Sequence, residues 1–318
     1  MSTTDPQRCG GAFVFAPALF LTVTLERRGD ADELHLHAGG QGLWIARMLA
    51  TLDIDVVLCG PFGGETGLVA RTLVAGEGIR VDAVEVESWS GAYVHDRRHG
   101  DRIVVAEVPP QALSRHELDE LYGAAVVTAL ELPVCVLGGP HDPSPVPADV
   151  YRRLATDLRS DDRRVIADLS GDPLEAALSG GIDVLKVSHE ELVRDGHATG
   201  ESLEELVDAG RDLQRRGAAH VVVSRAAEPA LLLAEDGAYE IEAPPLEPAD
   251  SAGAGDSMTA GIAAGLVEHL GVVDAVRLGA AAGTLNATRH GKGSGHRDQV
   301  ERLAAQIVVR PLNARTTA

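Results

Sequence analysis

The residues best suited to chemistry lie in one short stretch near the C-terminus, ADSAGAGDSMTAGIAA, Ala249–Ala264. Its small residues Gly253, Ala254 and Gly255 open an apolar helix, so their N–H groups can converge on one oxyanion while the helix dipole attracts it. Asp256 follows on the first turn, where a carboxylate can take a proton from a neighbouring hydroxyl. An anion hole beside a base is what phosphoryl transfer needs. The stretch predicts a kinase centre, against the alternative of an ordinary capped, glycine-rich buried helix.

A second glycine-rich segment, AGGQGLWIAR, spans Ala38–Arg47 and opens another helix after a strand. Glycines such as Gly39 and Gly40 let a ligand hydroxyl or phosphate approach the backbone closely. The alternative is a tight turn between a strand and a helix. The segment is therefore a candidate for binding the substrate.

The elements that must position these groups alternate between apolar strands and amphipathic helices, which is typical of a mainly parallel sheet covered on both faces. The C-terminal third reads as consecutive helices, so the sheet is expected to end before it. We predict strands at Ala12–Phe15, Asp55–Cys59, Val134–Leu137, Arg164–Asp168, Val184–Val187, His220–Ser224 and Ala230–Ala234. We predict helices at Leu43–Leu52, Gly67–Ala75, Arg115–Thr128, Val150–Leu158, Leu203–Gln214, Ala254–Leu270, Val273–Arg289 and Arg297–Gln306.

Two stretches alternate strictly between polar and apolar residues, as strands with one wet face do. They are ELHLH at Glu33–His37 and the three runs VDAVEVE, AYVHDRR and RIVVAEV within Val81–Val108. We expect them to form a small sheet that covers the main domain as a lid. The prediction is thus one α/β domain over residues 1–318 with lid segments at about 19–38 and 81–110.

At these motifs the chain resembles the PfkB (ribokinase-like) carbohydrate kinases, nearest their 1-phosphofructokinase and tagatose-6-phosphate kinase branch. DSAGAGDSMTAG matches the second signature of the family and AGGQGLWIAR its first. CGPFGGETG at Cys59–Gly67 and DVLKVSHEEL at Asp183–Leu192 match its strand-turn-helix and Lys-Pro-Asn-x-x-Glu elements. The resemblance implies a ribokinase-like fold with a lid, and transfer of the ATP γ-phosphoryl group to a substrate hydroxyl. It makes Asp256 the base and Gly253, Ala254 and Gly255 the anion hole.

The same resemblance places an acceptor site that has lost the family's polar groups. Gln41 replaces a lysine, Trp44 replaces an asparagine, and Phe20 stands where the branch has a carboxylate for sugar hydroxyls. The arginine that the branch uses for a substrate phosphate is missing around Ser90–His95. These losses weigh against a phosphorylated ketohexose. Either the aromatic side chains bind a flatter, more apolar alcohol, or they fill a pocket that has decayed. The candidate acceptor residues are Phe20, Gly39, Gly40, Gln41 and Trp44.

The nucleotide side implied by the resemblance is also altered. Ser188 replaces the asparagine of the Asn-x-x-Glu element while Glu191 remains, so weakened handling of Mg²⁺ through Glu191 is expected. The family turn Ser-x-Gly-x-x-Gly reads Ser224–Pro229 here and keeps neither glycine. The candidate ATP-binding residues are Lys186, Ser188, Glu191, Ser224, Asn286 and Gly291, although packing would equally explain the last two.

Composition limits the partners. The 318 residues carry a net charge of −20, which argues against nucleic acid or an anionic membrane surface. The three cysteines are too widely spaced for a zinc site or a disulfide framework, and without a signal peptide or apolar span we expect a cytoplasmic protein. A homodimer through the lid is plausible because exposed sheet edges favour pairing. The alternatives are a non-catalytic ribokinase-like protein that binds a metabolite or nucleotide and, less well supported, a dinucleotide-dependent oxidoreductase.

Overall fold

Apolar strands assemble into one ten-stranded sheet in the computed structural model, which describes residues 10–100, 102–139, 143–289 and 291–312. From β11 to β5 the neighbouring strands are parallel, and β12, β13 and β14 continue the sheet antiparallel at one edge. Their order is β14 (Val308–Pro311), β13 (Gly237–Glu242), β12 (Glu228–Ala234), β11 (Ala218–Arg225), β10 (Ile182–Ser188), β9 (Arg164–Asp168), β8 (Val134–Gly138), β1 (Gly11–Phe15), β4 (Asp55–Gly63) and β5 (Arg80–Val86).

Helices cover both faces of this sheet because alternate strand residues point to opposite sides. In β1, Ala12 and Val14 enter one hydrophobic core while Phe13 and Phe15 enter the other. The first core is shared with α1 (Gln41–Thr51), α2 (Gly64–Ala75), α8 (Ala254–Val267), α9 (Val272–Ala287) and α10 (Arg297–Ala304). The second is shared with α3 (Arg115–Ala129), α4 (Asp149–Ser160), α5 (Gly171–Gly180), α6 (His189–Arg194) and α7 (Leu203–Arg215). The predicted α/β class is confirmed.

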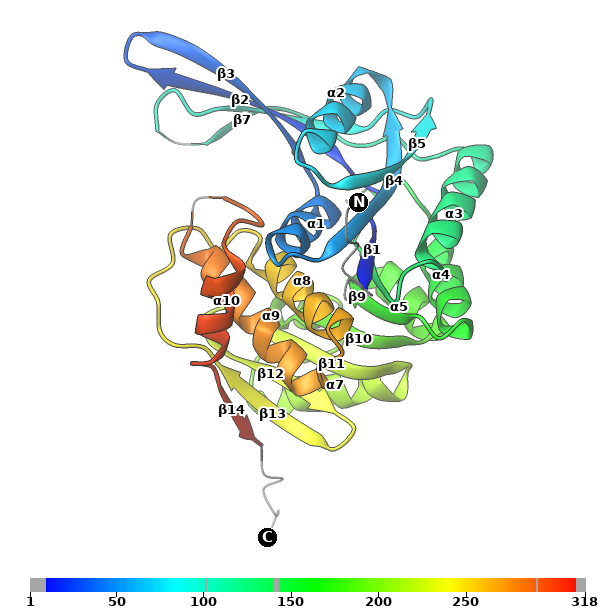
Figure 1. The fold of residues 1–318 in the computed structure, drawn as a ribbon, viewed down its shortest axis with the longest axis vertical. Coiled ribbons are helices and arrows are strands. Elements are labelled where there is room, and N and C mark those ends of the chain that lie inside the picture. The colour runs from blue at the N-terminus through cyan, green and yellow to red at the C-terminus, as the bar shows by residue number, and fades with distance from the viewer. Residues whose placement is uncertain (1–9, 101, 140–142, 290, 313–318) are drawn as a thin grey trace, which may run out of the picture.

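A separate four-stranded sheet forms the lid, in the order β3-β2-β6-β7. Its strands are β2 (Phe20–Arg28), β3 (Ala31–Gly39), β6 (Gly91–Asp96) and β7 (Ile103–Val108). Figure 1 shows the β2–β3 hairpin projecting well beyond the main domain. The hairpin leads directly into α1, so the lid and the glycine-rich segment at the start of that helix are continuous in the chain.

Two expectations from the sequence need correction. The first alternating run, VDAVEVE, does not enter the lid, because β5 pairs with β4 in the main sheet. Its polar residues Asp82 and Glu85 produce the alternation, although apolar side chains on both faces of β5 pack against the two cores. The sheet also does not end before the terminal helices, since β14 follows α10 and pairs with β13.

The root of the lid is held to α3 by Glu117. The carboxylate of this buried residue accepts hydrogen bonds from the N–H groups of Glu87 and Ser88 at 2.8 and 2.9 Å, and from the N–H of Ser114 at 2.7 Å. Burial alone would raise the pKa of Glu117, but these bonds outweigh it and lower the pKa to about 2. The connection between the two sheets is therefore anchored by an ionised carboxylate.

Two further observations bear on the sequence analysis. Cys59 and Cys135 are buried free thiols, and Cys9 lies outside the described residues. In the described part of the chain, every helix is too short or too polar to cross a bilayer.

Candidate active site

The anion hole is built where α8 begins. Gly253 adopts φ +80° and ψ 4°, a left-handed conformation that glycine tolerates without strain. This conformation turns the chain sharply into the helix, and the N–H of Ala254 donates to the carbonyl of Ser251 at 3.2 Å. No side chain in the described ranges caps this helix, so the N–H groups of Gly255 and Asp256 remain open to an anion.

Asp256 lies beside a buried charge network. Lys186, at the end of β10, is 7% exposed and donates to the carboxylate of Asp168 at 3.3 Å. Asp168 also accepts from the hydroxyl of Thr259 at 2.7 Å, which ties β9 to α8. A Cβ atom on Gly255 would lie 2.6 Å from Lys186 Nζ, so the ammonium group is at the anion hole. Lys186 is therefore part of this centre rather than a surface residue.

The pKa values follow from this crowding. Burial and the neighbouring charge of Asp168 raise the pKa of Asp256 to about 7, although Lys186 and Lys292 oppose the shift. Burial by itself would lower the pKa of Lys186, but the carboxylates around it outweigh burial and raise the pKa. Asp256 can thus exchange a proton near neutral pH, which suits a general base.

Gln41 connects the two glycine-rich segments. Its side-chain oxygen accepts from the N–H of Gly139 at 2.5 Å, just beyond the end of β8. Its amide group also hydrogen-bonds Asp256. Gln41 therefore positions the candidate base instead of supplying a positive charge.

The aromatic side chains of the acceptor side make specific contacts. The Phe20 ring is 5% exposed and lies 5.0 Å from the Tyr93 ring, between centroids. A Cβ atom on Gly91 would lie 2.3 Å from Phe20, so the ring occupies the space that a side chain on Gly91 would need. The Nζ of Lys292 lies over the Trp44 ring, at 3.6 Å from the ring centroid. Both rings are thus engaged by this chain's own groups.

The residues predicted for the nucleotide are spread more widely. Ser188 and Glu191 form a capping box at the start of α6, with the Ser188 N–H and hydroxyl both donating to Glu191 at 2.8 Å. Ser224 pairs with Ser188 in the strand register. Asn286 is fully buried and donates to the carbonyl of Ala252 at 3.1 Å. Asn286 therefore supports the anion-hole loop.

Gly291 lies at the start of the loop that follows α9, where its carbonyl accepts from the Ser294 hydroxyl at 2.7 Å. Its predicted contact with the nucleotide stays a prediction.

Sequence reasoning missed three members of the centre: Lys292, Asp168 as a charged partner, and Thr259. One signal was present, because Lys186 and Lys292 are the only lysines in 318 residues. Both act on the pKa of Asp256. The scarcity of lysine was therefore the signal in the sequence that could have pointed to Lys292 as a member of the candidate centre.

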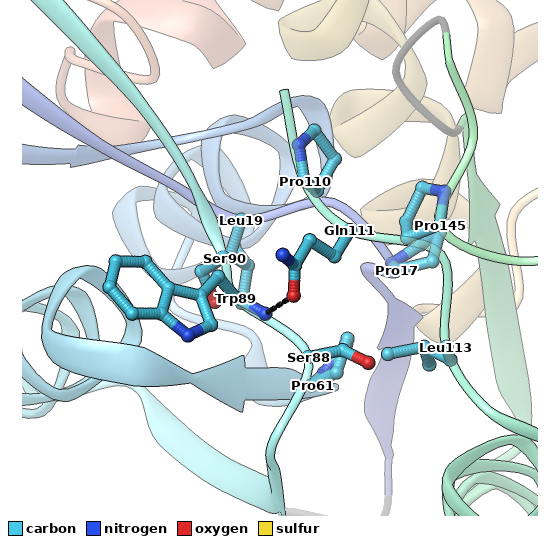
Figure 2. Close-up of a pocket in the computed structure, with 10 residues that line it drawn as sticks. All are labelled: Pro17, Leu19, Pro61, Ser88, Trp89, Ser90, Pro110, Gln111, Leu113 and Pro145. Atoms are coloured by element: carbon cyan, nitrogen blue, oxygen red, sulfur yellow. Dashed lines mark hydrogen bonds between the residues drawn. The ribbon is translucent and has the colours of Figure 1, made fainter. Parts of the chain in front are cut away.

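A hollow at the lid root is separate from this centre. It lies between the segment that enters the lid, Ser88–Ser90, and the segment that leaves it, Pro110–Leu113. Figure 2 shows Gln111 inside this hollow, where its side chain accepts from the N–H of Trp89 at 3.0 Å. Its lining contains none of the predicted site residues. We assign it to the connection between the lid and the main domain.

Comparison with known proteins gives one consistent result. The sequence profile of the family described as pfkB family carbohydrate kinase matches residues 19–298. The chain is 30% identical over 274 residues to 1-phosphofructokinase of Bacillus subtilis, covering 86% of this chain and 88% of that protein. It is 30% identical over 301 residues to ATP-dependent 6-phosphofructokinase isozyme 2 of Mycobacterium tuberculosis, covering 90% and 86%.

Solved structures agree. Phosphofructokinase-2 from Escherichia coli in complex with potassium superposes with a TM-score of 0.79 at 25% identity, covering 93% of this chain and 98% of that one. Ribokinase of Arabidopsis thaliana complexed with ribose and ATP superposes with a TM-score of 0.69 at 20% identity, covering 93% and 98%.

Proposed function

Because the chain belongs to the pfkB family of carbohydrate kinases, we propose that Asp256 is the base of its phosphoryl transfer. The reaction class follows from the family: the γ-phosphoryl group of ATP passes to a hydroxyl of a carbohydrate-like acceptor. The observation that carries the residue assignment is the position of Asp256. It lies on the first turn of α8, next to open N–H groups, with a pKa of about 7.

The proposed steps use groups already in place. The carboxylate of Asp256 accepts the proton of the acceptor hydroxyl as the oxygen attacks the γ-phosphorus, and ADP leaves. Gln41 hydrogen-bonds this carboxylate and so limits its orientation. The N–H groups at the start of α8, together with the ammonium of Lys186, stabilise the charge that spreads over the transferred phosphoryl oxygens. Asp168 positions Lys186 for this role.

Mg²⁺ fits the donor chemistry on the nucleotide side. The carboxylate of Glu191 lies at the end of β10 and acts electrostatically on Lys186, so it is close to the anion hole. Carboxylate oxygens and water are the ligands that Mg²⁺ prefers, and we propose that Glu191 holds the ion, partly through water ordered by Ser188. When bound, the ion neutralises phosphate charge on ATP.

We also propose that the lid joins two copies of the chain. The register of the lid strands places a set of apolar side chains on one face. On this apolar lid face Leu34 is 60% exposed and Leu36 is 41% exposed, an arrangement that marks an interaction surface. The face comprises Val23, Leu25, Leu34, Leu36, Val94, Ala106 and Val108. The opposite face carries Thr24 and His95, both buried.

The test is acceptor-dependent consumption of ATP by the wild type and by Asp256→Asn, across sugars, sugar phosphates, nucleosides and polyols. Removing the base should lower kcat by about 10²–10⁴-fold with little change in the affinity for ATP. Asp274→Asn is the matched control, since Asp274 also lies on the first turn of a helix, α9, but pairs with Arg277 there. Retention of full turnover by Asp256→Asn would overturn the assignment. Tight binding of ATP without turnover of any acceptor would favour a non-catalytic binding protein.

A further inference from the structure

The loop that leads into the anion hole is held mainly by hydrogen bonds. This anion-hole loop, residues 249–253, is exposed from Ala249 to Ala252. Exposed residues gain little from the hydrophobic effect, so hydrophobic packing does not fix them. The conformation of the loop nevertheless matters, because the left-handed Gly253 sets the direction in which α8 begins.

The end of α9 supplies the hydrogen bonds. The carbonyl of Ala287 accepts from the N–H groups of Ala249 and Asp250 at 2.8 and 3.1 Å. One residue earlier, the side-chain N–H of Asn286 donates to the carbonyl of Ala252 at 3.1 Å. Both ends of the loop are therefore attached to the last turn of the same helix.

The bond from Asn286 acts on the peptide group that enters the anion hole. Since a peptide bond is planar and trans, a carbonyl of Ala252 directed at Asn286 points the N–H of Gly253 to the opposite side. A Cβ atom on Gly253 would lie 3.6 Å from Nδ2 of Asn286, so the amide packs directly against this glycine. Asn286 therefore fixes the peptide plane from which the chain turns into α8.

The other end of the same amide holds a second loop. Oδ1 of Asn286 accepts from the N–H of Gly293 at 2.9 Å, in the C-terminal loop, residues 291–296. The carbonyl of Gly293 in turn accepts from the hydroxyl of Thr51 in α1 at 3.3 Å. A Cβ atom on Gly293 would lie 2.8 Å from the Trp44 carbonyl, so glycine lets the loop lie against α1. The amide thus joins the anion-hole loop, through the C-terminal loop, to the helix that opens with Gln41.

We propose that Asn286 is a positioning residue for phosphoryl transfer, which orients the N–H groups of the anion hole without touching the nucleotide. The inference rests on the proposed function, in which these N–H groups stabilise charge on the transferred phosphoryl oxygens. An asparagine suits this role because its short, planar amide supplies both a donor and an acceptor. Both bonds are made by a fully buried side chain, where leaving a polar group unpaired is costly.

The contacts favour positioning over direct binding of the nucleotide. The side chain of Asn286 is fully buried and uses its nitrogen and its oxygen on backbone groups, so it offers no surface to a ligand. Ala252, by contrast, is exposed, and its carbonyl can bond to water when the amide is absent. Loss of the amide should therefore free the anion-hole loop rather than unfold the domain.

The variant that tests the residue is Asn286→Leu, which nearly keeps the side-chain volume and removes both hydrogen bonds. With the acceptor that the wild type turns over fastest, we expect kcat to fall about 10–100-fold, because transition-state contacts are sensitive to small displacements. The calorimetric Kd of a non-hydrolysable ATP analogue with Mg²⁺ should change less than about twofold. Asn286→Ala, which leaves room for water, gives the same test if the leucine variant does not fold.

Gln214→Met is the matched control. Gln214 also donates from one amide to two backbone carbonyl groups, those of Ala219 and Leu233, at 3.0 and 3.2 Å. It lies where β11 begins, whereas Ser188 and Ser224 lie where β10 and β11 end. The control should lower Tm as Asn286→Leu does, but keep kcat. Hydrogen exchange followed by mass spectrometry adds a readout without an acceptor: the peptide covering residues 249–257 should exchange faster in Asn286→Leu only.

Four results would each overturn the inference: full kcat in the folded Asn286 variants, unchanged exchange of the 249–257 peptide, an equal loss of kcat in Gln214→Met, or a Kd of the analogue that weakens in step with kcat. The last would assign Asn286 to the nucleotide. The base is tested separately. If Asp256→Asn retains full turnover while Asn286→Leu loses it, the base assignment fails and this inference stands. If Asp256→Asn is inactive and Asn286→Leu is fully active, this inference alone fails.

Discussion

At the scale of single residues, the proposed chemistry depends on the charges around Asp256. Asp168 and burial favour its protonated form, whereas Lys186 and Lys292 favour the carboxylate. The resulting pKa of about 7 places the candidate base in the range where it can accept a proton and release it again. Lys186 lies against Gly255 at the start of α8, and Lys292 lies over the ring of Trp44.

This balance predicts the dependence of activity on pH. Only the deprotonated form of Asp256 can act as a base, so a pKa raised to about 7 means that activity rises with pH. We expect kcat/KM to increase about tenfold per pH unit below 7 and to level above it. Initial rates from pH 5 to 9 at fixed Mg²⁺ and ATP provide the measurement. A profile that is flat between pH 5.5 and 8 would contradict the raised pKa.

At the scale of elements, the turn between β11 and β12 shows how the nucleotide side has changed. Ala226 has a positive φ of 49° in a position where the resembled family has glycine. A side chain in this conformation costs about 1–2 kcal/mol. The strand pair continues regardless, because Arg225 and Glu228 pair across the turn. The turn therefore places a non-glycine residue in a conformation that glycine adopts without strain.

We predict that Ala226→Gly stabilises the protein by about 0.5–1 kcal/mol, since relief of strain exceeds the added entropy of the unfolded chain. Opening the backbone there should also lower KM for ATP. Urea denaturation and steady-state kinetics measure the two effects. Ala227→Gly is the control, because Ala227 does not have a positive φ and should lose stability on the same change. Equal effects of the two substitutions would rule out strain at Ala226.

At the scale of the whole molecule, the lid is a sheet with two different faces. One carries His95 and the contact to Arg102, which points toward the catalytic side. The other is the apolar lid face, which is exposed in the single chain. Figure 1 shows that the hairpin that carries part of it projects from the main domain. A second copy that covers the apolar lid face would restrict the motion of each lid and so influence closure over the acceptor.

Dimer formation is therefore expected to depend on the apolar lid face. We predict that the wild type is a dimer at micromolar concentration and that Leu36→Lys makes it monomeric, because a charge would be buried without a partner. Light scattering coupled to size-exclusion chromatography measures both masses. His37→Lys is the control: His37 is the next residue along β3, is exposed, and lies on the opposite face. A monomeric wild type would exclude the interface.

The sequence alone determined the elements whose signals are local. The small residues before Asp256 mark the anion hole because only they let N–H groups converge there, and α8 begins at Ala254 as expected. The parallel strands were evident as continuous apolar runs, because a strand in a sheet covered on both faces buries nearly all of its side chains. β5 was misassigned because its polar residues Asp82 and Glu85 give it the alternation of a lid strand, whereas its place in the main sheet depends on pairing with β4.

Only the tertiary structure decided which charges meet. Gln41 stands where the resembled family has a lysine. No residue near Gln41 in the sequence indicates that Lys292 lies over Trp44 of the helix that Gln41 opens. That contact depends on Asn286 and Gly293, which join the C-terminal loop to the anion-hole loop. Electrostatic interactions act through space, so the fold decides which charges surround the candidate base, while the candidate base and anion hole themselves lie in one continuous segment.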